Sequence, residues 1–147
     1  MSDSFLVDSN ILVYAYDRSE ATKQKKARDV LDWLELRRAG VLSTQILGEF
    51  FSVATRKLAK SLASEELYQA LEDYLRSWRT LPITRAIVLE AGRGCVRLRM
   101  SFWDAQIWAT AKMNQIPTVL SEDFQHQRTI EGVEFLNPFM AKIPGEV

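Results

Sequence analysis

Four short apolar segments, separated by helical sequence patterns, constrain the fold of this chain more than any other feature. They are Phe5–Val7, Val41–Ser43, Thr118–Leu120 and Val133–Leu136. Short apolar runs bounded by polar residues are typical of strands in the middle of a sheet. Strands that alternate with helices need crossover connections, and such connections place the strands parallel. The sequence therefore predicts an α/β fold, with a mostly parallel, twisted sheet and helices on both faces.

Between these segments, apolar residues recur at the spacing of one helix face. Thr44 and Ser64 are expected to be helix N-caps, and Gly40 is expected to stop the first long helix. Residues 81–84 are expected to form an edge or irregular strand, because Pro82 removes a donor from the ladder. The periodicity predicts helices over about 19–39, 45–60, 65–78, 86–98 and 103–114.

The chain shows no repeat, low-complexity segment or linker, so residues 1–147 are expected to form a single domain. A single cysteine, Cys95, cannot form an internal disulfide, which favours a reducing compartment. No apolar run approaches the roughly 20 residues that a bilayer span requires, and the N-terminus has no basic segment typical of a secretory signal. We therefore expect a cytoplasmic protein with no membrane association.

The net charge of the chain neither favours nor excludes a polyanionic partner, because 19 Lys and Arg residues balance 19 Asp and Glu residues. The distribution is more informative. Between Arg85 and Met100, four arginines accompany one acid. Clustered arginines are typical of surfaces that bind phosphates, although a solvated helix face would show the same pattern. Arg93, Arg97 and Arg99 are therefore candidates for guiding a nucleic-acid backbone.

Four acidic residues lie where loops and helices leave the predicted sheet. Asp8 ends the first strand, and Asp123 follows the strand at 118–120. Glu49 lies about one helical turn after the second strand, and Asp104 opens a helix whose other nearby residues are apolar. Ligands of open parallel sheets bind beyond the carboxyl ends of the strands, where successive loops converge. We therefore expect these four carboxylates to cluster.

Each acid also has a simpler interpretation. Asp8 and Asp104 could be helix N-caps, and Asp123 could be a turn residue. Glu49 could reach out to solvent, although it interrupts an apolar helix face. All four simpler interpretations would have to coincide at one end of the sheet, so a functional cluster is favoured.

Clustered carboxylates raise one another's pKa unless a cation neutralises them. A ligand set made only of oxygens, with no His or Cys cluster, favours Mg²⁺ or Mn²⁺ over zinc. Such ions activate water and stabilise charge on the leaving oxygen of a phosphodiester. The pattern therefore predicts a Mg²⁺ or Mn²⁺ site for phosphoryl chemistry.

The sequence around these acids falls into five characteristic segments, which are Phe5–Asn10, Thr44–Phe50, Phe102–Ile107, Ser121–Phe124 and Gly132–Phe139. Together they resemble the PIN-domain ribonucleases, and in particular the VapC-type toxins of bacterial toxin–antitoxin pairs. The resemblance implies a PIN-like α/β/α sandwich. It also implies a metal-binding and catalytic quartet, made of Asp8, Glu49, Asp104 and Asp123. By the same resemblance, Asn10 and Ser121 are polar residues that support this quartet.

By this resemblance, the chain is expected to be a Mg²⁺-dependent endoribonuclease that cleaves RNA. Asp104 or Asp8 would also orient the attacking water, and the arginines would guide the RNA. The resemblance further implies a homodimer and a cognate antitoxin whose tail lies over the active site. One set of apolar residues is expected either to form a shared face or groove for these partners or only to close the core: Phe50, Phe51, Leu67, Leu71, Tyr74 and Trp78.

Three further residues lie next to the characteristic segments or within them. Gln127 stands after His126 where relatives often have a glycine, which leaves the shape of that loop open. His126 is expected to be a surface-loop residue, since metal-assisted hydrolysis needs no histidine base. Trp103 is expected to pack against the protein, with stacking on a base as the alternative.

Other functions fit the sequence less well. A phosphatase of the haloacid dehalogenase type would need an acid at Asn10, and a response-regulator receiver would need an acidic pair near the first strand and a lysine after a late strand. An inactive RNA-binding or scaffolding PIN-like domain remains the main alternative, although the quartet is complete.

Overall fold

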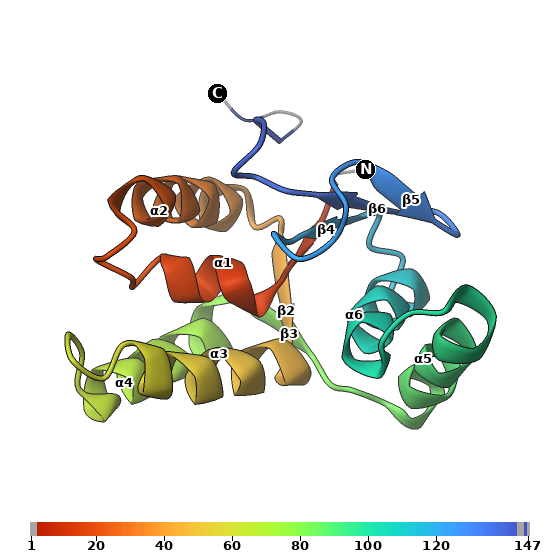
Figure 1. Cartoon of the computed structure of the whole chain (residues 1–147), viewed down its shortest axis with the longest axis horizontal. Coiled ribbons are helices and arrows are strands. Elements are labelled where there is room, and N and C mark those ends of the chain that lie inside the picture. The colour runs from red at the N-terminus through yellow and green to blue at the C-terminus, as the bar shows by residue number, and fades with distance from the viewer. Residues whose placement is uncertain (1–2, 144–145, 147) are drawn as a thin grey trace.

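The computed structural model describes residues 3–143 and 146, and its centre is a sheet of short strands (Figure 1). The strands are β1 (Phe5–Val7), β2 (Gly40–Ser43), β3 (Arg79–Leu81), β4 (Thr118–Leu120), β5 (Arg128–Ile130) and β6 (Val133–Leu136). They lie in the order β3-β2-β1-β4-β6-β5. All neighbours are parallel except β5, which pairs antiparallel with β6. The predicted mostly parallel sheet is confirmed.

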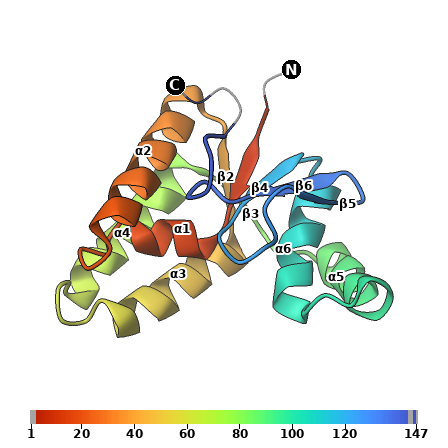
Figure 2. The same ribbon diagram turned by 45° about the horizontal axis from the view of Figure 1, so that its top comes forward.

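Helices cover both faces of this sheet, as Figures 1 and 2 show. One side carries α1, α2, α3 and α4, and the other side carries α5 and α6. The bounds are α1 (Ser9–Tyr14), α2 (Ala21–Arg37), α3 (Thr44–Lys57), α4 (Ser64–Ser77), α5 (Arg85–Leu98) and α6 (Phe102–Met113). This arrangement is the predicted α/β/α sandwich. No helix within the described segments is long and apolar enough to cross a membrane.

The two strands in the middle of the sheet are buried at every position, because helices cover them on both faces. These strands are β1 and β4, and they pair with each other. The helices contribute their apolar faces to the same core, with Phe50 from α3 and Trp108 from α6 fully buried. Sheet and helices therefore fix the position at which β1 and β4 end.

Two predicted helix caps lie one residue too late. The N-cap of α3 is Ser43, whose hydroxyl accepts a hydrogen bond from the backbone N–H of Ile46 at 3.2 Å. Thr44 is the first helical residue instead. Similarly, the N-cap of α4 is Ala63, and Ser64 opens the helix. Ser43 and Thr44 offer equivalent capping chemistry, so the sequence pattern did not distinguish them, whereas Ala63 has no capping side chain and its backbone N–H donates to Glu66.

The expectation that Gly40 stops the first long helix is wrong. The helix α2 ends earlier, and Arg38 takes the left-handed C-cap conformation with φ 53°. Gly40 begins β2, where a Cβ atom would lie only 2.1 Å from the Trp78 ring. Glycine is required there because an indole occupies the space of a side chain. The strand β3 lies at the edge of the sheet, as predicted, but it ends before Pro82.

The strand β5 was not predicted. It forms a hairpin with β6 through Glu131 and Gly132, whose φ angles are 46° and 87°. Two successive residues with positive φ are typical of a tight two-residue hairpin loop. Arg128 and Thr129 are exposed, so the strand has no apolar run that would reveal it in the sequence.

The residues proposed as a shared face lie largely in the core. The exposed fractions of Phe50, Leu67 and Trp78 are 0%, 1% and 8%. Their place in the core supports the simpler interpretation, in which they close the domain. The exposed apolar residues of α4 are instead Tyr68 and Leu75.

Candidate functional site

The carboxyl ends of β1 and β4 lie side by side, and polar residues follow both strands. Val7 of β1 is in register with Leu120 of β4. The backbone N–H of Asp8 donates to the carbonyl oxygen of Leu120 at 2.9 Å, which extends this pairing by one residue. Asp8 and Ser121 therefore leave the sheet next to each other, although they are far apart in the sequence.

The carboxylate of Asp8 is almost entirely buried, with 3% of the residue exposed. One oxygen accepts from the backbone N–H of Ser9 at 2.7 Å and caps α1, so the helix-cap interpretation holds for this residue. The other oxygen accepts from the Ser121 hydroxyl at 2.7 Å. Burial raises the pKa of Asp8 to about 6, against the lowering effect of these two hydrogen bonds, and the charges of Asp123 and Asp104 raise it further.

The amide of Asn10 connects the groups around Asp8. Its Nδ2 donates to Ser121 Oγ and to Asp123 Oδ2, both at 3.2 Å, and lies 3.4 Å from Asp8 Oδ2. Its Oδ1 accepts from the backbone N–H of Glu122 at 3.2 Å. The Ser121 hydroxyl also accepts from the backbone N–H of Asp123 at 3.1 Å. The structure thus joins two predicted acids and both predicted supporting residues in one hydrogen-bonded group.

Glu49 and Asp104 approach this group from α3 and α6. Burial raises the pKa of the half-buried Glu49, and the charges of Asp8, Asp104 and Asp123 raise it further against a hydrogen bond with Gln45. Asp104 lies in the first turn of α6, whose N-cap is Ser101, so its interpretation as an N-cap is wrong. The charges of Asp104 and Asp123 thus act on both Asp8 and Glu49, which is expected for acids at the same end of the sheet.

These acids form a neighbourhood of like charge without a preformed ligand cage. Within residues 3–143 and 146, no three Asp, Glu, His or Cys side chains are placed to hold one metal ion. The Asn10 amide stands between Asp8 and Asp123 and donates to both. The four side chains still suit Mg²⁺ or Mn²⁺, because each offers carboxylate oxygens and their like charges repel one another until a cation neutralises them. The acids therefore fit a divalent ion by the type of their ligand atoms and by their charge.

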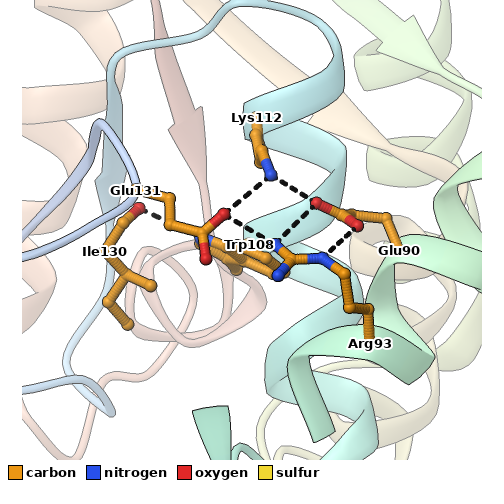
Figure 3. A network of polar contacts seen from close by, with 6 residues as sticks. All are labelled: Glu90, Arg93, Trp108, Lys112, Ile130 and Glu131. Atoms are coloured by element: carbon orange, nitrogen blue, oxygen red, sulfur yellow. Dashed lines mark hydrogen bonds and ion pairs between the residues drawn. The ribbon is translucent and has the colours of Figure 1, made fainter. Parts of the chain in front are cut away.

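Arg93, one of the predicted RNA-guiding residues, belongs to an ion-pair network with Glu90, Lys112 and Glu131 (Figure 3). Its Nε lies 2.8 Å from Glu90, and its Nη2 lies 2.6 Å from Glu131. The guanidinium also lies over the Trp108 ring, 5.7 Å from the ring centre. Its donors are thus engaged in joining α5, α6 and the β5–β6 turn.

Arg97 and Arg99, the two remaining arginine candidates, are exposed at the end of α5. Neither forms an ion pair with any residue in the part of the chain that the structure describes. Their role toward RNA stays a prediction.

The sequence interpretation missed two glutamines beside Glu49. Gln106 is buried in α6, and its Nε2 donates to Gln45 Oε1 at 2.9 Å. The Nε2 of Gln45 donates in turn to the backbone oxygen of Trp103 at 3.1 Å. The sequence signal for this pair was Gln106 itself, an amide side chain within the apolar stretch that follows Asp104. The expected packing of Trp103 is wrong, because 61% of this residue is exposed.

His126 lies in the loop after β4 and is partly exposed. Its Nδ1 accepts a hydrogen bond from the backbone N–H of Asn137 at 2.9 Å, which ties the loop to the end of β6. The following residue, Gln127, has φ 65°, the left-handed conformation that glycine adopts more easily. The loop therefore keeps a glycine-like turn without the glycine.

The family model described as PIN domain matches residues 5–131 of this chain. The toxin VapC20 of Mycobacterium tuberculosis, which cleaves the sarcin-ricin loop, has a similar fold, with a TM-score of 0.63, 19% identity and coverage of 79% of this chain and 87% of that one. A toxin–antitoxin complex from Klebsiella pneumoniae gives a TM-score of 0.66 at 19% identity, covering 92% and 98%. DNA-bound VapBC from Salmonella typhimurium gives 0.67 at 16% identity, covering 91% and 97%. No curated protein matches the chain.

Proposed function

Because this chain belongs to the PIN domain family, we propose that it is an endoribonuclease that depends on Mg²⁺ or Mn²⁺. The observation that supports the site most strongly is the hydrogen-bonded group of Asp8, Asn10, Ser121 and Asp123. Glu49 and Asp104 add two further negative charges to it. Among the described residues none of these acids pairs with a lysine or arginine, and a bound cation would neutralise their repulsion.

Asp8, Glu49, Asp104 and Asp123 would hold the ion in this proposal. When bound, a divalent ion supplies positive charge that polarises the phosphodiester and stabilises charge on the leaving oxygen. Asp8 or Asp104 orients the attacking water. Asn10 and Ser121 position the carboxylates of Asp8 and Asp123 through the hydrogen bonds described above.

We further propose that the chain is the toxin of a toxin–antitoxin pair, with a cognate antitoxin as partner. The similar structures from Klebsiella pneumoniae and Salmonella typhimurium are a toxin–antitoxin complex and a DNA-bound VapBC complex. A homodimer and a cytoplasmic location belong to the same proposal. The antitoxin would limit RNA cleavage when both proteins are present.

The test is incubation of the purified chain with total cellular RNA in Mg²⁺, in Mn²⁺ and in EDTA, followed by mapping of the cut ends. We expect cuts at defined positions with either ion and none in EDTA. Equal cutting in EDTA would contradict metal dependence.

A second candidate function is an inactive RNA-binding or scaffolding domain. One observation favours it, namely that no three acids among the described residues stand close enough to share an ion. RNA that binds to the chain but stays intact in both metals would support this candidate and contradict the first.

A further inference from the structure

Trp103 is the most exposed of the four tryptophans of this chain, and it directly precedes Asp104. Its exposed fraction is 61%, whereas Trp78 and Trp108 are 8% and 0% exposed, and Trp33 is partly buried against the core. An indole offers a large apolar surface, which a protein gains stability by burying. An exposed indole in the first turn of a helix that supplies a candidate site residue therefore calls for a role outside the core.

The backbone and ring of Trp103 are held in place. Its carbonyl oxygen accepts from Gln45 Nε2 at 3.1 Å, and Gln45 is fixed in turn by Gln106 at 2.9 Å. The Phe102 ring meets the indole edge-on, with 5.2 Å between ring centres and an interplanar angle of 83°. A side chain that is already ordered loses little conformational entropy when a ligand binds to it.

The same contacts place Trp103 at the border of the acid group. Gln45, which holds the Trp103 carbonyl oxygen, lies four residues before Glu49 on the same helix, α3. Asp104 is the next residue along α6. Trp103 therefore lies where the first turn of α6 meets α3, the two helices that carry Asp104 and Glu49.

The charges around Trp103 favour a nucleic acid over an apolar partner. Arg97 and Arg99 precede it closely in the sequence, are exposed, and have no ion-pair partner within the described chain. An exposed aromatic ring together with free cations is typical of surfaces that bind single-stranded nucleic acid, because bases stack on the ring and phosphates meet the cations. A second copy of the chain would need a wider apolar surface than one indole.

We propose that Trp103 is a stacking platform for one unpaired base of the RNA, next to the phosphodiester at the acid group. This inference rests on the proposed ribonuclease function and adds a residue that contacts a base of the RNA substrate. Stacking on an aromatic ring tolerates every base, so Trp103 contributes affinity and position more than sequence preference.

The first test measures equilibrium binding of a short fluorescein-labelled single-stranded RNA in EDTA, so that cleavage does not interfere. Trp103→Ala should weaken binding by about tenfold, the range expected for loss of one stacked base. Trp103→Phe should keep most of the affinity, because a ring remains. The matched control is Leu36→Ala, which truncates an apolar residue that is 87% exposed. It should bind like wild type.

The second test replaces one base at a time in the same RNA by an abasic site. At one position, removal of the base should weaken wild-type binding by about as much as Trp103→Ala does. The two changes together should then be no worse than either alone, because they remove the same contact.

The outcomes separate this inference from the function on which it rests. If wild type binds RNA and the Trp103→Ala variant binds equally well, or if the two changes add fully, the stacking role is wrong. A Trp103→Ala variant with altered self-association in sedimentation and unchanged RNA affinity would also overturn it. If wild type neither binds RNA in EDTA nor cuts total cellular RNA in Mg²⁺, the proposed ribonuclease function fails first.

Discussion

Two charged groups in this molecule differ in the signs of the charges that they bring together. The acid group gathers Asp8, Glu49, Asp104 and Asp123, which carry charges of one sign. The ion-pair network gathers two acids and two bases, which are Glu90, Glu131, Arg93 and Lys112. Burial and neighbouring carboxylates raise the pKa of Asp8 to about 6, whereas hydrogen bonds from Arg93 and Lys112 lower the pKa of Glu90 to about 2.

The opposite pKa shifts show what each group does for the fold. The network favours the ionised carboxylate, so its charges stabilise the folded chain and connect α5, α6 and the β5–β6 turn (Figure 3). At Asp8 and Glu49 the acid group disfavours the ionised carboxylate, so these two charges reduce the stability of the folded chain. Such a group fits the proposed metal site, because a bound cation would relieve the repulsion between its acids.

The largest effect is expected when the same substitution, glutamate to glutamine, is made once in each group. Glu49→Gln should lower metal-dependent RNA cleavage at least about 100-fold, since even residues that only support metal ligands cost up to that much. Its melting temperature in EDTA should stay the same or rise, because a raised pKa marks a disfavoured charge. Cleavage rates and thermal melts of the purified variants test both expectations.

The matched control is Glu90→Gln in the ion-pair network. It removes the shared partner of Arg93 and Lys112 and should cost about 1–2 kcal/mol of stability, with cleavage unchanged. If Glu49→Gln destabilises the chain and Glu90→Gln abolishes cleavage, the comparison between the two groups is wrong.

The pH dependence of stability should differ in sign between the groups. Because the folded-state pKa of Asp8 is raised to about 6, the folded chain binds more protons than the unfolded chain between about pH 4 and 6. Stability in EDTA should therefore fall as the pH rises through this window, by an amount on the order of 3 kcal/mol from Asp8. Asp8→Asn should remove this part of the profile in denaturant titrations.

Ionised Glu90 stabilises the folded chain, and its contribution changes at lower pH than that of Asp8. Its pKa is lowered to about 2, so its contribution is complete above the ordinary glutamate pKa and is lost as the pH falls toward 2. Glu90→Gln should flatten the acid limb of the same titration. An Asp8→Asn profile that matches wild type between pH 4 and 6 would remove the strain assigned to the acid group.

A divalent ion should produce the third effect. Binding to the folded state alone adds about 2.7 kcal/mol at 100 times the dissociation constant, which raises the melting temperature of a chain this size by about 5–10 °C. Thermal melts in a Mn²⁺ titration should show this rise, and EDTA should reverse it. The rise should persist in Glu90→Gln and shrink in Glu49→Gln. A wild-type melting temperature that stays flat well above millimolar Mn²⁺ would exclude a metal site.

Much of the fold could be predicted because the central strands and helix faces follow strong local patterns. The residues of β1 and β4 are apolar apart from Thr118, and the buried faces of the helices are mostly apolar. The hairpin strand β5 could not be found, since two of its residues are exposed and its place depends on pairing with β6. The role of Gly40 depends on Trp78, a contact that local sequence does not reveal.

The candidate site was predictable to a similar degree. Strand ends indicated where Asp8 and Asp123 would lie, because the ends of parallel strands meet at one edge. The pairing of Arg93 with Glu131 could not be foreseen, because it depends on the unpredicted hairpin. The Gln45–Gln106 contact joins α3 and α6, which are far apart in the sequence, so local patterns do not reveal it.

The most direct test of the central claim is Asp104→Asn, measured beside wild type for its melting temperature in EDTA and for RNA cleavage in Mg²⁺. Asparagine keeps the shape of the side chain and removes one charge from the acid group, so the fold should persist with an equal or slightly higher melting temperature. RNA cleavage should be lost, because a carboxylate that holds the ion is replaced by an amide. A variant that folds normally and cuts RNA at the wild-type rate would contradict the assignment of Asp104 and of the acid group as the metal site.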